Sequence, residues 1–124
     1  IRRPPRSTQG VSSAASDVYK RQDIEITNDP IKAVENADVV MTDTFVSIHN
    51  TDKNRLEKFL PKFTVTPNLM EQAKKDAIFL HCLPAKRDQE VSSVVIDGPQ
   101  SVVWDEAENR LHVQKALLVS LLNV

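Results

Sequence analysis

The sequence predicts an α/β protein: a three-layer, Rossmann-like domain with a mainly parallel sheet of about four to five strands and a long C-terminal helix. Short apolar runs, such as residues 38–43 and 77–80, alternate with segments that have helical periodicity. Pro follows Asp29 and Thr66, a pattern typical of a helix cap and first helical position. These features together indicate βαβ units, in which strands pair in parallel.

The 124-residue length allows one domain, and the composition divides it unevenly. Residues 1–22 carry five basic side chains and one acidic side chain, are rich in Pro and Ser, and lack apolar periodicity. Such a segment has too little apolar surface to pack. Residues 11–22 resemble translated adapter sequence, and the first residue is Ile rather than Met. We therefore expect residues 1–22 to be a disordered, foreign leader; a basic nucleic-acid-binding arm and an organelle transit segment are the alternatives.

The first βαβ unit is expected between residues 24 and 43. Residues 24–27 alternate apolar and polar side chains, which predicts a short strand. Asp29 is placed to cap a helix through residue 37, and residues 38–43 form a more buried strand that ends at Asp43.

A helix, a strand and a second helix are expected between residue 50 and the strand that leads into residues 81–84. A helix that begins after Asn50 or Thr51 carries Leu56, Phe59 and Leu60, and residues 63–66 form a strand. The pair Thr66-Pro67 begins another helix. An apolar strand then leads into residues 81–84, His-Cys-Leu-Pro, where an imidazole, a thiol and a Pro lie at a strand end.

The last third is predicted to be a strand followed by the long helix. Residues 91–96 are compatible with strand or helix, residues 101–104 form the last strand, and Trp104 belongs to the core. Asp105 caps the final helix, with Glu108 completing a capping box. The apolar surface of this helix is wider than a single surface helix needs, so we expect the helix to pack against additional polypeptide. The apolar positions are Ala107, Leu111, Leu117, Leu118, Leu121 and Leu122.

Composition excludes several classes of function. No apolar run approaches the ~20 residues of a membrane-spanning helix. Cys82 is the single cysteine, which excludes an internal disulfide and fits a reducing compartment. The only glycines, Gly10 and Gly98, form no Gly-rich phosphate loop. The three histidines lack metal-ligand spacing with one another or with Cys82, so no metal site is expected.

Four side chains are candidates for chemistry, each with an ordinary structural alternative. Asp43 suits a cationic substrate group or a loop cap, and Ser47 suits a substrate hydrogen bond or a plain loop hydroxyl. Cys82 is a nucleophile if nearby cations lower its pKa, and otherwise a packed thiol. Arg110 suits an anion at the sheet edge or a surface pair with Glu106.

Two motifs give the chain a family resemblance. Residues 81–84, together with residues 102–112 (Val-Val-Trp-Asp-Glu-Ala-Glu-Asn-Arg-Leu-His), closely resemble the C-terminal half of ornithine carbamoyltransferases. The segment 37–43 agrees in order and spacing. Cys82 is the discriminating residue, since aspartate carbamoyltransferases have Pro there. The resemblance covers residues 23–124 and identifies them as a partial ornithine-binding domain.

The resemblance implies an activity and a set of site residues. The family transfers the carbamoyl group of carbamoyl phosphate to the δ-amine of ornithine, giving citrulline and phosphate, as in arginine biosynthesis, with no cofactor. By motif position, Asp43, Ser47 and Ile48 would contact ornithine, Cys82 and the backbone of Leu83 would line the carbamoyl site, and Arg110 would hold carbamoyl phosphate. It further implies a cytoplasmic homotrimer that binds neither nucleic acid nor membrane.

Two departures limit what the resemblance implies. The family loop usually reads Trp-Xaa-Ser-Met-Gly, whereas residues 45–49 read Phe-Val-Ser-Ile-His. A carbamoyltransferase for another amine, such as putrescine or an acylated ornithine, and a non-catalytic amino-acid-binding homologue are therefore alternatives. The family's Ser-Thr-Arg-Thr and His-Pro motifs are absent from these residues, so we expect the chain alone to be inactive.

Overall fold

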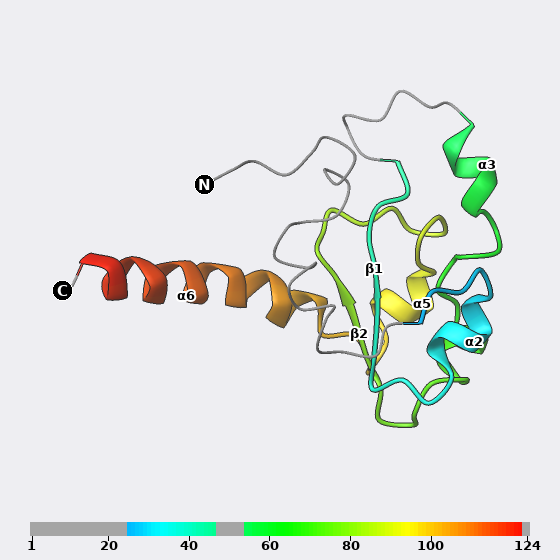
Figure 1. Cartoon of the computed structure of the whole chain (residues 1–124), viewed down its shortest axis with the longest axis horizontal. Coiled ribbons are helices and arrows are strands. Elements are labelled where there is room, and N and C mark those ends of the chain that lie inside the picture. The colour runs from blue at the N-terminus through cyan, green and yellow to red at the C-terminus, as the bar shows by residue number, and fades with distance from the viewer. Residues whose placement is uncertain (1–24, 47–53, 123–124) are drawn as a thin grey trace.

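A computed structural model describes residues 25–46 and 54–122 of the chain. Predictions about residues 1–24, Ser47, Ile48 and His49 lie outside these residues. The described part contains short helices and strands followed by one long C-terminal helix, α6 (Figure 1). In chain order the elements are α2 (Pro30–Val34), β1 (Val39–Thr42), α3 (Arg55–Phe59), α4 (Pro67–Met70), β2 (Ile78–His81), α5 (Ser93–Ile96) and α6 (Val103–Leu122).

The sheet is parallel, as predicted. β1 pairs with β2 in a register that sets Val39 opposite Ile78 and Thr42 opposite His81. The other edge of β2 bonds to the chain that precedes α6: Phe79 N donates to Gln100 O at 2.8 Å. The α/β class and the long final helix are confirmed, whereas the described residues form two strands in place of the four to five predicted.

Three predicted strands are wrong in the described part of the chain. Residues 25–27 have no regular structure, and Ile26 is 93% exposed. In the segment 63–66, only Val65 makes a parallel bridge, to Val91. Ser101 bridges Phe79, but α6 begins two residues later. Alternating or apolar residues give a strand only where a neighbouring strand extends alongside, and these segments have a partner for one residue or none.

The helix starts depend on local contacts, and two are as predicted. Asp29 Oδ1 accepts from Ile31 N at 3.0 Å at the start of α2, and Thr66 Oγ1 accepts from Leu69 N at 3.3 Å at the start of α4. The helix with Leu56 and Phe59 is α3, whose N-cap is Asn54. The ambiguous segment 91–96 divides, because Val91 bridges Val65 and Arg87 before α5 begins.

α6 begins earlier than predicted and extends away from the sheet (Figure 1). Val103 is its first residue and is fully buried, so Asp105 lies within the first turn and is not the cap. Acidic side chains in this first turn stabilise the helix through their interaction with the positive end of its dipole. Trp104 is 66% exposed, so its assignment to the core is wrong: the helix starts at Val103, and that residue takes the buried position.

The apolar core lies under β2 and between the short helices. Phe79, Val91 and Val103 are its fully buried members. The remaining core residues are Val34, Val40, Val65, Leu69, Met70, Val95 and Ile96. This packing fixes β1, β2 and the start of α6 relative to one another, and so positions the carboxyl ends of both strands.

Candidate functional site

Asp43 and Cys82 meet at the carboxyl edge of the sheet. The register sets Thr42 opposite His81, so the next residue of each strand lies beside the other. The Cys82 thiol donates to Asp43 Oδ1 at 3.2 Å, and Thr44 N donates to the same oxygen at 2.6 Å. Both side chains are exposed. The parallel pairing therefore joins two residues that are 39 positions apart in the sequence.

The turn 81–84 is held by hydrogen bonds from three directions. Leu83 has a φ of 51°, and its N–H donates to His81 Nδ1 at 2.9 Å. The Thr44 hydroxyl donates to Pro84 O at 2.8 Å, which ties the turn to the segment after β1. His81 N donates to Glu106 Oε2 of α6 at 2.9 Å. These contacts set the direction of the Cys82 side chain and of the Leu83 backbone.

A buried polar pair supports the turn from behind. His81 and Glu90 are fully buried, with His81 Nε2 and Glu90 Oε1 separated by 3.5 Å. Glu90 Oε1 also accepts from Lys86 N, and Glu90 O accepts from Val65 N at 2.9 Å. Glu90 Oε1 and Glu90 O accept backbone hydrogen bonds and so fix the path of the loop that follows the turn. His81 Nε2 and Glu90 Oε2 are buried without a hydrogen-bond partner among the described residues, which carries a cost.

Asp43 and Cys82 shift each other's pKa. The hydrogen bond from Cys82 lowers the pKa of Asp43, the Thr44 backbone N–H and the charge interaction with His81 lower it further, and burial opposes them. Burial raises the pKa of Cys82 above 9.0, and the hydrogen bond and negative charge of Asp43 add to this rise. At neutral pH the site therefore presents a carboxylate and a protonated thiol.

A cavity of about 590 Å³ opens beside this pair. The turn supplies Cys82, Leu83 and Pro84, and one face of α6 supplies Trp104, Ala107 and Arg110. Ala85, Arg87 and Ile96 complete the lining. The structure thus brings together four predicted site residues, Asp43, Cys82, Leu83 and Arg110, while Ser47 and Ile48 lie outside the described residues. Arg110 adds a guanidinium to a cavity that Cys82 and Leu83 also line, and a guanidinium suits an anionic ligand.

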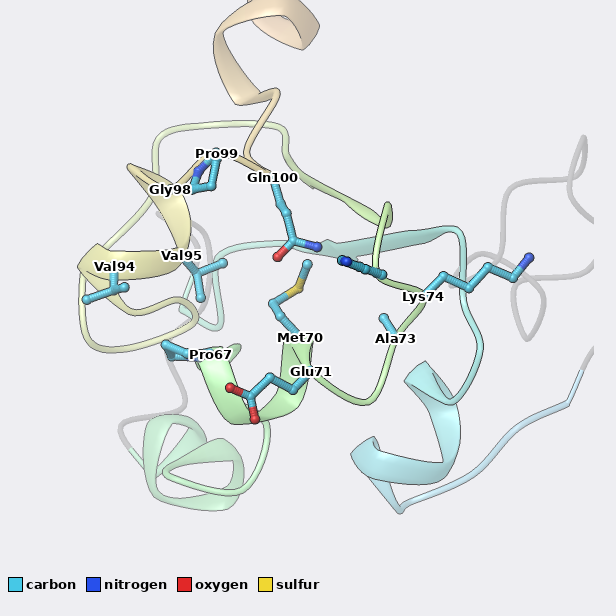
Figure 2. Close-up of a pocket in the computed structure, with 11 residues that line it drawn as sticks. Pro67, Met70, Glu71, Ala73, Lys74, Val94, Val95, Gly98, Pro99 and Gln100 are labelled. Carbon is cyan, nitrogen blue, oxygen red and sulfur yellow. The ribbon is translucent and has the colours of Figure 1, made fainter.

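A second cavity, of about 430 Å³, lies at the opposite end of the sheet (Figure 2). Pro67, Met70, Val94 and Pro99 contribute to its mostly apolar wall. Figure 2 shows Lys74 directed away from it, and the Lys74 ammonium pairs with Asp38 at 2.6 Å. It contains no predicted site residue and adjoins the start of β2. Since ligands of open α/β sheets bind at the carboxyl ends of strands, the first cavity is the candidate site.

Sequence reasoning missed several residues of this site. Thr44 follows a predicted strand end, so its position was available, but its bond to Pro84 spans 40 residues. Glu106 lay in a predicted capping box, and only the earlier helix start turns it toward His81. Trp104 was assigned to the core. No local signal marks contacts that depend on how the helix packs against the sheet.

The described residues contain no cluster of His, Cys, Asp or Glu that would hold a metal ion. The same residues include no helix that is both long enough and apolar enough to cross a membrane.

Comparison with known proteins gives consistent matches. The profile of the family "Aspartate/ornithine carbamoyltransferase, Asp/Orn binding domain" matches residues 4–121. An ornithine carbamoyltransferase of Cenarchaeum symbiosum (strain A) is 66% identical over 99 residues, which cover 80% of this chain and 33% of that protein. The chain thus spans about a third of the length of the curated relatives it matches.

Solved structures match in fold as well as in sequence. The ornithine carbamoyltransferase of Pyrococcus furiosus aligns with a TM-score of 0.67 and 50% identity, over 73% of this chain and 29% of its own. An N-acetyl-L-ornithine transcarbamylase aligns with a TM-score of 0.72 and 31% identity, over 87% of this chain and 34% of its own.

Proposed function

The chain belongs to the aspartate/ornithine carbamoyltransferase family through its Asp/Orn binding domain, and on this basis we propose that it forms the ornithine-binding part of an enzyme that makes citrulline from ornithine and carbamoyl phosphate. The observation that carries the proposal is the contact of Cys82 with Asp43 beside the cavity that Arg110 lines. The relatives' names favour ornithine as the amine. A family match alone would leave the amine open.

The proposed reaction is a direct transfer. The neutral δ-amine of ornithine attacks the carbonyl carbon of carbamoyl phosphate, a C–N bond forms, and the bond from carbon to the phosphate oxygen breaks. Phosphate departs with the electron pair of that bond, and the proton that the amine loses passes to the phosphate. Catalysis of this type needs positioning and stabilisation of developing charge more than covalent chemistry. Arg110 is proposed to hold the phosphate, because its fork of donors suits phosphate oxygens.

The protonation states support specific roles for the pair at the strand ends. The lowered pKa of Asp43 keeps it a carboxylate, which suits a charged amine of ornithine. The raised pKa of Cys82 keeps the thiol protonated, which argues against a thiolate nucleophile and for a positioning role next to the carbamoyl group. The backbone of Leu83 lines the same cavity. Ser47 and Ile48 are proposed to contact ornithine as well.

The remaining parts of the proposal concern the whole protein. We assign residues 23–124 to a partial ornithine-binding domain and residues 1–22 to a foreign leader, although the family profile also matches from residue 4. The complete enzyme is proposed to be a cytoplasmic homotrimer of arginine biosynthesis. The upstream part would supply the main phosphate-binding residues, so the chain alone should be inactive.

The test needs a protein with both parts. We define the completed protein as residues 23–124 joined to the part of the Cenarchaeum symbiosum relative that this chain does not cover. Incubated with ornithine and carbamoyl phosphate, the completed protein should form citrulline, and the chain alone should form none. Substituting Arg110 by Ala in the completed protein should raise the KM for carbamoyl phosphate. A completed protein that is folded but forms no citrulline would contradict the proposal.

A second candidate function is carbamoyl transfer to another amine. Residues 48–49 read Ile-His where the family loop usually reads Met-Gly, and one similar structure is an N-acetyl-L-ornithine transcarbamylase. Comparing kcat/KM for ornithine, putrescine and N-acetylornithine in the completed protein would decide between them. A value for either other amine above that for ornithine would replace the first proposal.

A further inference from the structure

The chain leaves the edge of β2 just before the strand ends. On this edge, Phe79 N donates to Gln100 O at 2.8 Å and Val102 N donates to Phe79 O at 3.0 Å. His81 N is the next donor on the same edge, because alternate residues of a strand point their N–H groups to the same side. The segment ceases to run beside β2 at this point, since α6 begins at Val103.

Glu106 supplies the acceptor that the departing segment no longer offers. Val102 O, the next carbonyl, accepts from Glu106 N at 3.0 Å as α6 begins. The Glu106 side chain reaches back, and its Oε2 accepts from His81 N at 2.9 Å. The carboxylate therefore takes the place of a strand carbonyl and joins the first turn of the helix to the last residue of β2.

This link lies between the two walls of the candidate site. Cys82 directly follows His81, and Arg110 lies four residues, about one helical turn, beyond Glu106. Val103 is the one buried residue in the described part of α6, so apolar packing alone fixes the helix at a single point. A second contact between the helix and the sheet is needed to fix the direction of the helix axis, and with it the position of Arg110.

We propose that Glu106 is a positioning residue for phosphate binding: it holds α6 against the end of β2 so that Arg110 faces Cys82 across the cavity. The inference rests on the proposed function for the identity of the ligand. It assigns Glu106 no contact with substrate. Its effect depends on the length of the side chain, which must reach His81 N, rather than on its charge.

Three substitutions in the completed protein separate reach from charge. Glu106→Gln keeps the length and one acceptor oxygen, and should retain a KM for carbamoyl phosphate within about twofold of the parent value. Glu106→Asp keeps the charge but is one methylene shorter, and Glu106→Ala has no acceptor; both should raise that KM about tenfold, with a smaller change in the KM for ornithine. Glu108→Ala, which removes the exposed partner of His112, is the matched control and should change neither.

A double-mutant cycle shows whether Glu106 acts through Arg110. In an Arg110→Ala background, Glu106→Ala should have no further effect on the KM for carbamoyl phosphate. The proposal would be overturned if the effects of the two substitutions on this KM added in full, or if Glu106→Ala raised the KM for both substrates equally. It would also be overturned if Glu106→Asp had the KM of the parent while Glu106→Gln had that of Glu106→Ala. A variant that failed to fold would be replaced by Glu106→Gln and Glu106→Asp, which differ least from the parent.

Failure of the proposed function can be distinguished from failure of this inference. If the completed protein forms no citrulline, the dissociation constant for inorganic phosphate is measured by calorimetry instead. Weaker phosphate binding by the Asp and Ala variants, but not by Gln, would support the positioning role without turnover. Unchanged phosphate binding in all three variants would overturn it.

Discussion

Asp43 and Cys82 illustrate how one hydrogen bond sets two protonation states. The bond stabilises the carboxylate and so lowers the pKa of Asp43. Loss of solvent around the thiol raises the pKa of Cys82, and the hydrogen bond to Asp43 and its negative charge raise it further. A lone cysteine after a strand suggests either a nucleophile or a packed thiol. The contact favours neither, since Cys82 is exposed and donates its proton to a neighbour.

The first residue-scale prediction concerns the reactivity of Cys82. In the completed protein, Asp43→Asn should lower the pH at which iodoacetamide alkylates Cys82 at half its maximal rate, because the charge that raises the thiol pKa is gone. The measurement is the alkylation rate of the thiol as a function of pH.

The control for this prediction removes a carboxylate at the other end of the sheet. Asp38 pairs with Lys74 at 2.6 Å, beside the start of β2. Asp38→Asn should leave the alkylation midpoint unchanged. Equal midpoints in the Asp43→Asn variant and the parent would show that Asp43 does not govern the thiol.

At the scale of elements, helix starts that depend on sequence neighbours were predictable, and the helix start that depends on distant contacts was not. Asp29 and Thr66 cap α2 and α4 as their sequence pattern indicates, because a cap bonds to its own neighbours. The start of α6 depends instead on where Val103 packs and on Glu106, which bonds to a residue 25 positions away. This is why the strand 101–104, the Asp105 cap and the core position of Trp104 were predicted wrongly.

The caps give an element-scale prediction. Thr66→Ala should lower the free energy of unfolding of the completed protein by about 1 kcal/mol, because the Leu69 N–H at the start of α4 loses its acceptor. Thr66→Ser keeps the hydroxyl and should recover most of the loss. Urea-induced unfolding measures both.

Ser92 is the matched comparison for Thr66. It is the N-cap of α5 but makes no side-chain cap hydrogen bond, and its hydroxyl is buried without a partner among the described residues. Ser92→Ala should therefore change stability by less than about 0.5 kcal/mol, or raise it. A loss equal to that of Thr66→Ala would show that the Ser92 hydroxyl also stabilises the start of its helix, contrary to this prediction.

At the scale of the whole molecule, α6 is too apolar for the part of the chain that contacts it. Five leucines, Leu111, Leu117, Leu118, Leu121 and Leu122, are 56–69% exposed. The sequence predicted an apolar surface wider than a single surface helix needs, and the structure leaves it uncovered. Because the chain spans about a third of the length of its relatives, we expect the remaining two thirds to supply the cover.

Hydrogen exchange tests this expectation. Helices in water owe most of their stability to packing, and α6 buries Val103 alone among its described residues. In the isolated chain, amides of residues 111–122 should therefore exchange much faster than in the completed protein, where the apolar face is covered. The amides of Ile78 and Phe79, which donate to Asp38 O and Gln100 O, should be protected in both and so report that the sheet is intact. Equal protection of α6 in the two proteins would mean that the helix is stable without a partner, and its apolar surface would need another explanation.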